Sequence, residues 1–191
     1  SYNRELNMKE GWCERKVLLK NDKSEKIEIQ SKKFISIKRE NLGVINYKIK
    51  VFENNVKVEV LPCIDVNIRN NDSNWNEPFL ETIESLSKNN LGIVKSNIIN
   101  SNFEISTFFK TEYLINNKKI NSSYSQSESK HLIGCKSKFL LNTDDELTIF
   151  KVGGYVNSND SNKNEFNNII EKESENALKT GFNELCKENI D

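Results

Sequence analysis

The stretch INYKIKV at residues 45–51 decides the fold class of this protein. Apolar and polar side chains alternate along it, so the two isoleucines, Tyr47 and Val51 project from one face of an extended chain. The stretch VKVEV at residues 56–60 alternates in the same way and follows an Asn-Asn turn at residues 54–55. Together the two stretches predict an antiparallel hairpin with one face in the core and one in solvent.

Similar runs recur up to residue 155 and are separated by clusters of Asn, Asp, Ser and Lys that are typical of turns. Many strands and few helices before residue 160 predict an antiparallel β-sandwich. Residues 75–90 alternate poorly and favour a short helix or an ordered excursion, because Phe79, Ile83 and Leu86 are three or four residues apart. The predicted strands lie within residues 17–20, 26–29, 92–95, 103–114, 132–141 and 146–155.

From Ser161 onward the apolar residues recur at helical spacing, and Glu, Lys and Asn fill the other face. Either Ser161 or Asn162 is a candidate N-cap. Gly181 either kinks this helix or ends a first helix before a second one. Such an amphipathic helix needs an apolar surface on which to pack.

Length and charge exclude several classes of protein. The 191 residues suffice for one large domain or two small ones. The 28 basic and 28 acidic residues balance, which argues against binding to nucleic acid or to anionic lipid. The sequence holds no run of about 20 apolar residues to span a membrane, and residues 1–11 lack the apolar core of a signal peptide. We therefore expect a cytoplasmic protein.

Few residues carry a pattern typical of catalysis. The single histidine, His131, lacks partners at metal-ligand or triad spacing, so we interpret it as an ordinary residue at the start of a strand. The acidic run at residues 144–146 has the composition of a turn. Gly153 and Gly154 lack the rest of a phosphate-binding loop, and they predict a bulge or a close approach of two backbones. The sequence assigns no catalytic residue, no metal site and no cofactor site.

The four cysteines are far apart, without the CxxC spacing of zinc and redox sites. We expect reduced thiols that pack as small apolar groups. They are Cys13, Cys63, Cys135 and Cys186.

Three aromatic residues are the candidates for a functional surface: Trp12, Trp75 and Phe79. Exposed aromatic rings can stack on sugars, and Tyr155 could join such a platform. Aromatic residues of a sandwich more often belong to its core or to a domain interface. The three residues are therefore candidates for sugar stacking or for a domain interface.

The hexapeptide LNMKEG at residues 6–11 resembles the L-D/N-M-K/R-E-G segment of the disaccharide phosphorylases of glycoside hydrolase family 65. Residues 177–185 resemble the helical linker that leads from that family's N-terminal sandwich into its catalytic (α/α)6 barrel. The last four of the remaining similar segments resemble the maltose phosphorylase branch in particular. In chain order these segments are FISI 34–37, GVINY 43–47, PCID 62–65, NNDSNW 70–75, FEISTF 103–108 and KVGGY 151–155.

The resemblance implies a galactose mutarotase-like super-sandwich at residues 1–160, followed by a helical linker at 161–191. It implies an enzyme that attacks maltose or a related α-glucosyl disaccharide with inorganic phosphate, inverting the anomeric centre to give β-glucose 1-phosphate and glucose. No metal or organic cofactor is implied. The catalytic acid and the binding sites for disaccharide and phosphate belong to the barrel, so the resemblance carries no catalytic residue over to this chain and implies that it is inactive alone.

The implied partners are the barrel of the same polypeptide and a second subunit in a homodimer of the full-length enzyme. The family's sandwich has several strands before the segment matched at residues 6–11, so we expect this sandwich to be incomplete and to associate through an exposed edge. Two alternatives stay open: a free-standing carbohydrate-binding module that uses Trp75 and nearby aromatic residues, and a purely structural assembly domain. The disaccharide linkage cannot be read from this part of the enzyme.

Overall fold

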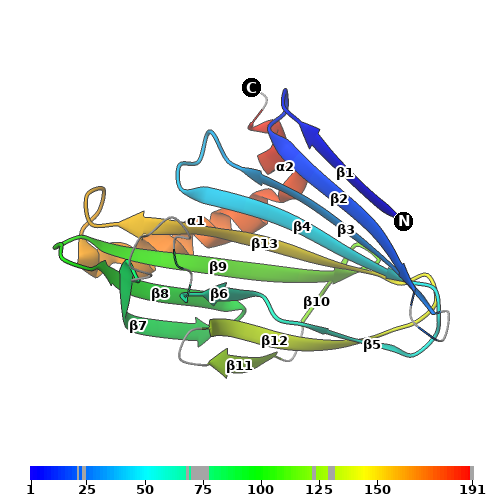
Figure 1. Cartoon of the computed structure of the whole chain (residues 1–191). Helices are drawn as coiled ribbons and strands as arrows, with labels where there is room; N and C mark the ends of the chain where they lie inside the picture. Colours follow the sequence, from blue (N-terminus) through cyan, green and yellow to red (C-terminus); the bar gives the residue numbers. More distant parts are fainter. Residues whose placement is uncertain are drawn as a thin grey trace.

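The computed structural model describes residues 1–20, 22, 25–67, 69, 78–121, 124–128 and 132–189, which form two antiparallel sheets and a C-terminal helical segment (Figure 1). The predicted antiparallel sandwich is thus confirmed. The nine-stranded sheet holds, in spatial order, β1 (Tyr2–Asn7), β2 (Trp12–Lys20), β3 (Lys26–Ile35), β4 (Leu42–Val51), β13 (Glu146–Asn157), β9 (Glu104–Ile115), β8 (Leu91–Ile98) and β7 (Leu80–Lys88), with β10 (Lys118–Ile120) paired to β9. The four-stranded sheet holds β11 (Tyr124–Glu128), β12 (Leu132–Leu141) and β5 (Val56–Val60), with β6 (Cys63–Asp65) also paired to β12.

Local alternation identified most of these strands correctly. All six runs predicted outside the expected hairpin lie almost entirely within observed strands, namely β2, β3, β8, β9, β12 and β13. The alternation of side chains on a half-buried strand is a local property of the sequence. It therefore identifies a strand regardless of which strand pairs with it.

The predicted hairpin of residues 45–51 and 56–60 is wrong, because its two strands belong to different sheets. Strand β4 pairs with β3 and β13, whereas β5 pairs with β12. The turn at Asn54 crosses from one sheet to the other and is tied to the β12–β13 turn, since Thr143 N and Oγ1 both donate to Asn54 Oδ1, at 3.2 and 3.1 Å. Strand β4 turns its apolar face toward the small sheet, and β5 turns its own toward the large sheet. Alternation alone cannot distinguish this arrangement from a hairpin.

The prediction of a helix or irregular excursion at residues 75–90 is also wrong for the part that the structure describes. Residues 80–88 form β7, an edge strand paired with β8. The register shifts between Thr82 and Glu84, so Ile83 is an extra residue in the strand. A bulge of this kind breaks the two-residue period and produces the three- and four-residue spacing of apolar side chains seen in the sequence.

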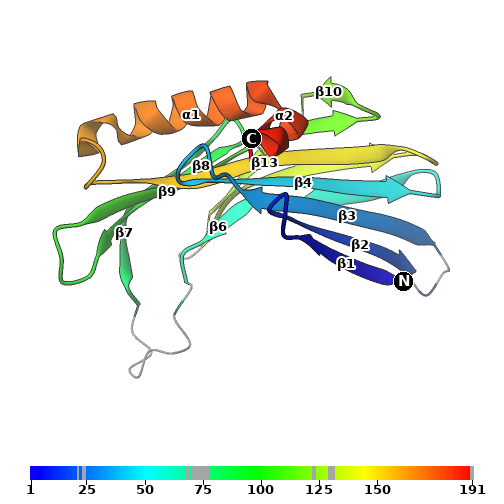
Figure 2. The ribbon, with the colours of Figure 1, turned by 90° about the horizontal axis from the view of Figure 1, so that it is seen from above.

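The C-terminal helices cover the outer face of the large sheet, as Figure 2 shows. They comprise a short 3-10 helix, η1 (Lys163–Glu165), then α1 (Phe166–Thr180) and α2 (Phe182–Lys187). Asn162 caps η1 by accepting a hydrogen bond from Asn164 N, and Gly181, at φ 83°, ends α1 before α2 begins. Among the described residues no helix is long and apolar enough to cross a membrane.

The sheet and the helices bury two separate cores. The outer core joins the helices to β4, β9 and β13, and its largest fully buried helical side chains are Phe166, Ile170 and Leu185. The inner core lies between the two sheets around Tyr113 and Leu141. Strands β3, β4, β9, β10 and β13 of the large sheet pack there against β5 and β12, whereas no described residue of β1 or β2 belongs to the inner core.

The glycine pair at the end of β13 marks a close backbone approach, as the sequence predicted. A Cβ atom placed on Gly154 would lie 2.0 Å from the carbonyl oxygen of Asn41. That oxygen accepts a hydrogen bond from Tyr155 N at 3.2 Å. Asn41 itself adopts a left-handed conformation with φ 65°, so the tight contact sets the path of the β3–β4 loop.

All four cysteines are free thiols. Cys135 and Cys186 are buried, and Cys13 and Cys63 are half-buried. Burial raises the pKa of the Cys135 thiol, so this residue is a neutral, small apolar group in the core.

Candidate functional site

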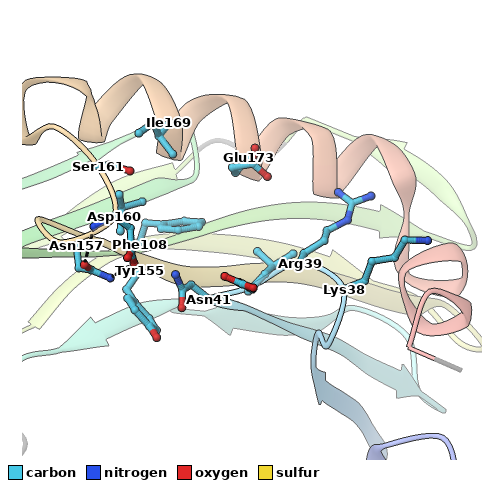
Figure 3. Close-up of a pocket in the computed structure, with 13 residues that line it drawn as sticks. Lys38, Arg39, Asn41, Phe108, Tyr155, Asn157, Asp160, Ser161, Ile169 and Glu173 are labelled. Atoms are coloured by element: carbon cyan, nitrogen blue, oxygen red, sulfur yellow. Dashed lines mark hydrogen bonds between the residues drawn. The ribbon is translucent and has the colours of Figure 1, made fainter. Parts of the chain in front are cut away.

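The candidate site is a pocket of about 310 Å³ between the β3–β4 loop, the end of β13 and the helix α1. Figure 3 shows Ile169 and Glu173 extending from α1, with Asn41, Phe108 and Tyr155 on the sheet side. Apolar side chains from the sheet and the helix form its floor, and polar side chains form its rim. Its size is at the lower end of the range typical of small-molecule sites.

One rim of the pocket is built by a turn after β13. Asn157 is buried, and its Oδ1 accepts hydrogen bonds from Asn159 N and Asp160 N, at 2.9 and 3.3 Å. Its Nδ2 donates to Asp160 Oδ2 at 2.5 Å. This carboxylate is therefore engaged in holding the turn, which is a structural role.

The other rim is built by the β3–β4 loop and is fastened to the end of the helical segment. The guanidinium of Arg39 donates two hydrogen bonds to the Glu188 carboxylate, both at 2.8 Å, and a third to Thr180 Oγ1 at 3.1 Å. Asn189 strengthens this connection, since its Oδ1 accepts from Ile37 N and its Nδ2 donates to Ile35 O. We call this set of contacts the Arg39 latch.

The Arg39 latch is electrostatically strong. Its hydrogen bonds raise the pKa of Arg39 and lower the pKa of Glu188, so both partners stay charged over a wide pH range. About a quarter of each side chain is exposed, 24% for Arg39 and 21% for Glu188, so solvent screens the pair only in part. Bidentate arginine–carboxylate pairs combine such strength with a defined geometry.

The latch makes stability depend on pH in a predictable direction. Because folding lowers the pKa of Glu188, its contribution is full above the ordinary glutamate pKa of about 4.3 and is lost as the pH falls through the lower folded value. We expect Glu188→Gln to reduce the free energy of unfolding by about 1 kcal/mol at pH 7 and by less at pH 3, below the ordinary glutamate pKa. Urea unfolding at both pH values measures this difference.

A control for this prediction is Glu184→Gln, which removes only an exposed pair with Lys187. Exposed pairs contribute little, so this variant should match the unmodified chain at both pH values. A Glu188→Gln effect that is equally large at pH 3 and pH 7 would contradict an electrostatic latch.

The pocket is lined mainly by groups that form hydrogen bonds. Its rim presents amide, carboxylate and cationic side chains, but neither cysteine nor histidine lines it. No group of three or more His, Cys, Asp or Glu side chains that could hold a metal ion exists within the described ranges. The geometry can hold a small polar molecule or a neighbouring protein surface.

The structure places two of the three aromatic candidates far apart. Trp12 lies at the start of β2, packs against the outer core and donates from Nε1 to Glu10 Oε2 at 2.7 Å. The ammonium of Lys32 lies 3.9 Å from the centre of its ring, so one ring face is already occupied. Phe79 precedes β7 at the opposite end of the sheet and is 52% exposed. Trp75, like His131, lies outside the described residues.

Sequence reasoning missed the Arg39 latch. Arg39 and Glu188 are 149 residues apart in the chain. Each looks like an ordinary surface residue in its own segment, and no local pattern indicates that they meet.

Comparison with known proteins is consistent along the whole chain. The model of the family described as glycosyl hydrolase family 65, N-terminal domain, matches residues 1–191. The alpha,alpha-trehalose phosphorylase of Thermoanaerobacter brockii is 24% identical over 196 residues, which cover 98% of this chain and 25% of that protein. The maltose phosphorylase of Bacillus subtilis (strain 168) is 34% identical over 76 residues, which cover 39% of this chain and 10% of that protein.

A solved structure agrees with the fold. A protein described as "putative kojibiose phosphorylase from human microbiome" superposes with a TM-score of 0.82 at 15% identity, over 100% of this chain and 24% of that one. The chain thus spans about a quarter of the length of the trehalose phosphorylase and of this structural neighbour. By its match to the family model over every residue, the chain belongs to glycosyl hydrolase family 65 and corresponds to that family's N-terminal domain.

Proposed function

We propose that the protein is an inverting disaccharide phosphorylase and that residues 1–191 form a non-catalytic part of it. The observation that carries this proposal is the family match over the whole chain. The relatives add support, because both curated proteins and the structural neighbour bear the names of phosphorylases. The substrate would be maltose or a related α-glucosyl disaccharide, and the products would be β-glucose 1-phosphate and glucose.

The choice of maltose rests on sequence similarity. Identity to the maltose phosphorylase is 34%, against 24% for the trehalose phosphorylase, although over a shorter stretch. The segments resembling the maltose branch include the strands around Asp65 and Gly154. In the proposed reaction one carboxylic acid protonates the leaving oxygen while phosphate attacks from the opposite face of the sugar, so a single catalytic carboxylate suffices.

The described part of the chain supports a bracing role. Neither cysteine nor histidine lines its pocket, and its conspicuous ion pair, the Arg39 latch, fastens the last helix to the sandwich. A segment fastened in this way leaves the sandwich in a fixed direction and would orient a following catalytic domain. We also propose that the full-length enzyme is a homodimer.

The full-length protein should release glucose 1-phosphate from maltose only when inorganic phosphate is present. Enzymatic detection of glucose and of the sugar phosphate measures the reaction. In the proton NMR spectrum, the coupling constant between the anomeric proton and H2 identifies the β product. Release of glucose without phosphate would indicate a hydrolase, and an α product would indicate retention. Parallel assays with trehalose and kojibiose measure the linkage preference.

The non-catalytic role has its own control. Glu40→Gln and Glu173→Gln remove carboxylates from the pocket rim and leave the Arg39–Glu188 ion pair in place. If residues 1–191 only brace the enzyme, both variants should keep kcat within about threefold, since a catalytic acid contributes about 10²–10⁴-fold. A loss of a hundredfold or more in either variant would assign catalysis to this pocket.

A further inference from the structure

Another pocket, of about 490 Å³, lies where the helical segment passes from α1 to α2 over the outer face of the large sheet. Its floor comes from β4, β9 and β13, and its roof comes from residues within 178–184. We call it the junction pocket. In Figure 2 the end of α1 and α2 lie above β13 and β4. The volume is within the range of about 300–1,000 Å³ that is typical of small-molecule sites.

Two polar atoms in the floor of the junction pocket have no hydrogen-bond partner in the part of the chain that the structure describes. They are Thr148 Oγ1 on β13 and Asn46 Oδ1 on β4, and both atoms are buried. Only 7% of Thr148 is exposed. The register pairs Thr148 with Lys48 and Phe150 with Asn46, so the four side chains form two neighbouring rows on one face. Buried polar groups almost always have a partner, so these two atoms indicate a ligand that supplies one.

The charged side chains that line the junction pocket are already neutralised. Each of the three has a partner of opposite sign: Lys48 pairs with Glu146, Glu112 with Lys119, and Glu184 with Lys187. An ionic ligand would have to compete with these pairs for its counter-charge. The pocket therefore suits an uncharged ligand.

Apolar side chains form the rest of the walls. Leu114 and Phe150 contribute from the sheet, and Leu178 and Phe182 contribute from the helices. The rings of Phe150 and Phe182 meet edge to face, with their centres 6.2 Å apart and their planes at 90°. Floor and roof are thus held together beside the pocket by an apolar contact.

The lining combines this apolar surface with uncharged hydrogen-bonding groups. The Thr148 hydroxyl both donates and accepts, and the amide of Asn46 does the same through its two terminal atoms. Asn117 and Asn183 bring two more amides to the rim. A matching ligand is small and neutral, carries several hydroxyl groups and presents C–H surface between them. A pyranose sugar has these properties.

We propose that the junction pocket binds a neutral pyranose sugar, whose hydroxyl groups form hydrogen bonds with Thr148 Oγ1 and Asn46 Oδ1. Because the walls come from both the sheet and the helical segment, the bound sugar stabilises the packing of α2 on the sheet. None of the aromatic candidates from the sequence takes part. The choice of D-glucose as the probe rests on the proposed function, in which glucose is a product.

Hydrogen–deuterium exchange of the full-length protein tests the site. Mass spectrometry of peptides spanning residues 178–184 should show exchange about threefold slower in millimolar D-glucose than in the same concentration of L-glucose. L-Glucose reproduces the general stabilisation that excluded sugars cause, but it has the opposite handedness. Peptides from β7, at the far edge of the sheet, are the internal control and should exchange equally in both sugars.

Substitutions at Thr148 identify the group that bonds the sugar. Thr148→Val replaces the hydroxyl by a methyl group and should abolish the protection by D-glucose, whereas Thr148→Ser keeps the hydroxyl and should retain most of it. Thr111→Val is the matched control, because Thr111 is also buried and lies on the opposite face of the same sheet. It should keep the full protection.

Thermal unfolding without sugar is the second measurement. Thr148→Val removes a buried hydroxyl that has no partner, so its Tm should equal or exceed that of the unmodified protein. A Tm several degrees lower would show that the hydroxyl already has a partner, and it would overturn the proposal.

Equal exchange of residues 178–184 in the two enantiomers would also overturn the proposal, and so would protection that persists in Thr148→Val. Exchange does not depend on turnover. A protein without phosphorolytic activity can still show the protection, and an active phosphorylase can still lack it. The failure of this proposal and the failure of the proposed function are therefore distinguishable.

Discussion

Gly154→Ala should lower the free energy of unfolding of this chain by about 3 kcal/mol or more, at or above the upper end of the range for overpacked sites. The added methyl would lie 2.0 Å from the carbonyl oxygen of Asn41, well inside van der Waals contact. A backbone oxygen cannot swing away as a side chain can. The strand and the β3–β4 loop must separate, and the hydrogen bond from Tyr155 N to that oxygen is then lost.

Gly43→Ala is the matched control, because Gly43 lies on the neighbouring strand and pairs with Gly153. Its nearest neighbour would be the tip of the Ile35 side chain at 3.2 Å, which can rotate. Alanine also restricts the unfolded chain more than glycine does, so the net change should stay below about 1 kcal/mol. Urea unfolding followed by circular dichroism compares the two variants, and equal stabilities would contradict the close-approach argument.

Ile170→Ala should cost about 3 kcal/mol, within the range of about 2–5 kcal/mol for truncating a fully buried isoleucine. Ile170 has no exposed surface and belongs to the outer core that joins α1 to the large sheet. Alanine has the higher helix propensity, which offsets only a few tenths of a kcal/mol. The cavity therefore dominates, and we expect α1 to loosen from the sheet at lower urea concentration.

Lys172→Ala, on the exposed side of the same helix, controls for helix propensity and should change stability by less than about 0.5 kcal/mol. An Ile170→Ala variant as stable as this control would show that the helix is dispensable for the sandwich. The measurement bears on the predicted boundary at residue 160. A strong effect means that residues 161–191 fold with the sandwich and are more than a linker.

Several parts of the fold could be predicted because their signals are local. Alternation located the strands, and the change to helical spacing after Ser161 located the helices. The glycine pair at residues 153–154 indicated a bulge or a close backbone approach, and the structure shows the close approach at Gly154. The family resemblance was predicted from short collinear segments and is confirmed over the whole chain.

The errors arose where a local pattern has more than one global solution. Residues 45–51 and 56–60 suit a hairpin and also suit two strands that face each other across a core. Strand β7 lost its alternation to one extra residue, Ile83, at a bulge. The arrangement of the candidate site residues could not be predicted for the same reason. Trp12 and Phe79 are both aromatic residues that the sequence marks as candidates for one surface, but they lie at opposite ends of the sheet. No local signal pairs Arg39 with Glu188.

The sequence by itself therefore determined the elements of this protein, since side-chain period and glycine placement act on neighbouring residues. Only the tertiary structure decided which strands share a sheet, which faces pack together and which charges meet. The physical reason is that apolar burial has no direction and rewards any arrangement that excludes water. The choice among arrangements falls to contacts between distant residues, such as the bond from Thr143 to Asn54 and the Arg39 latch.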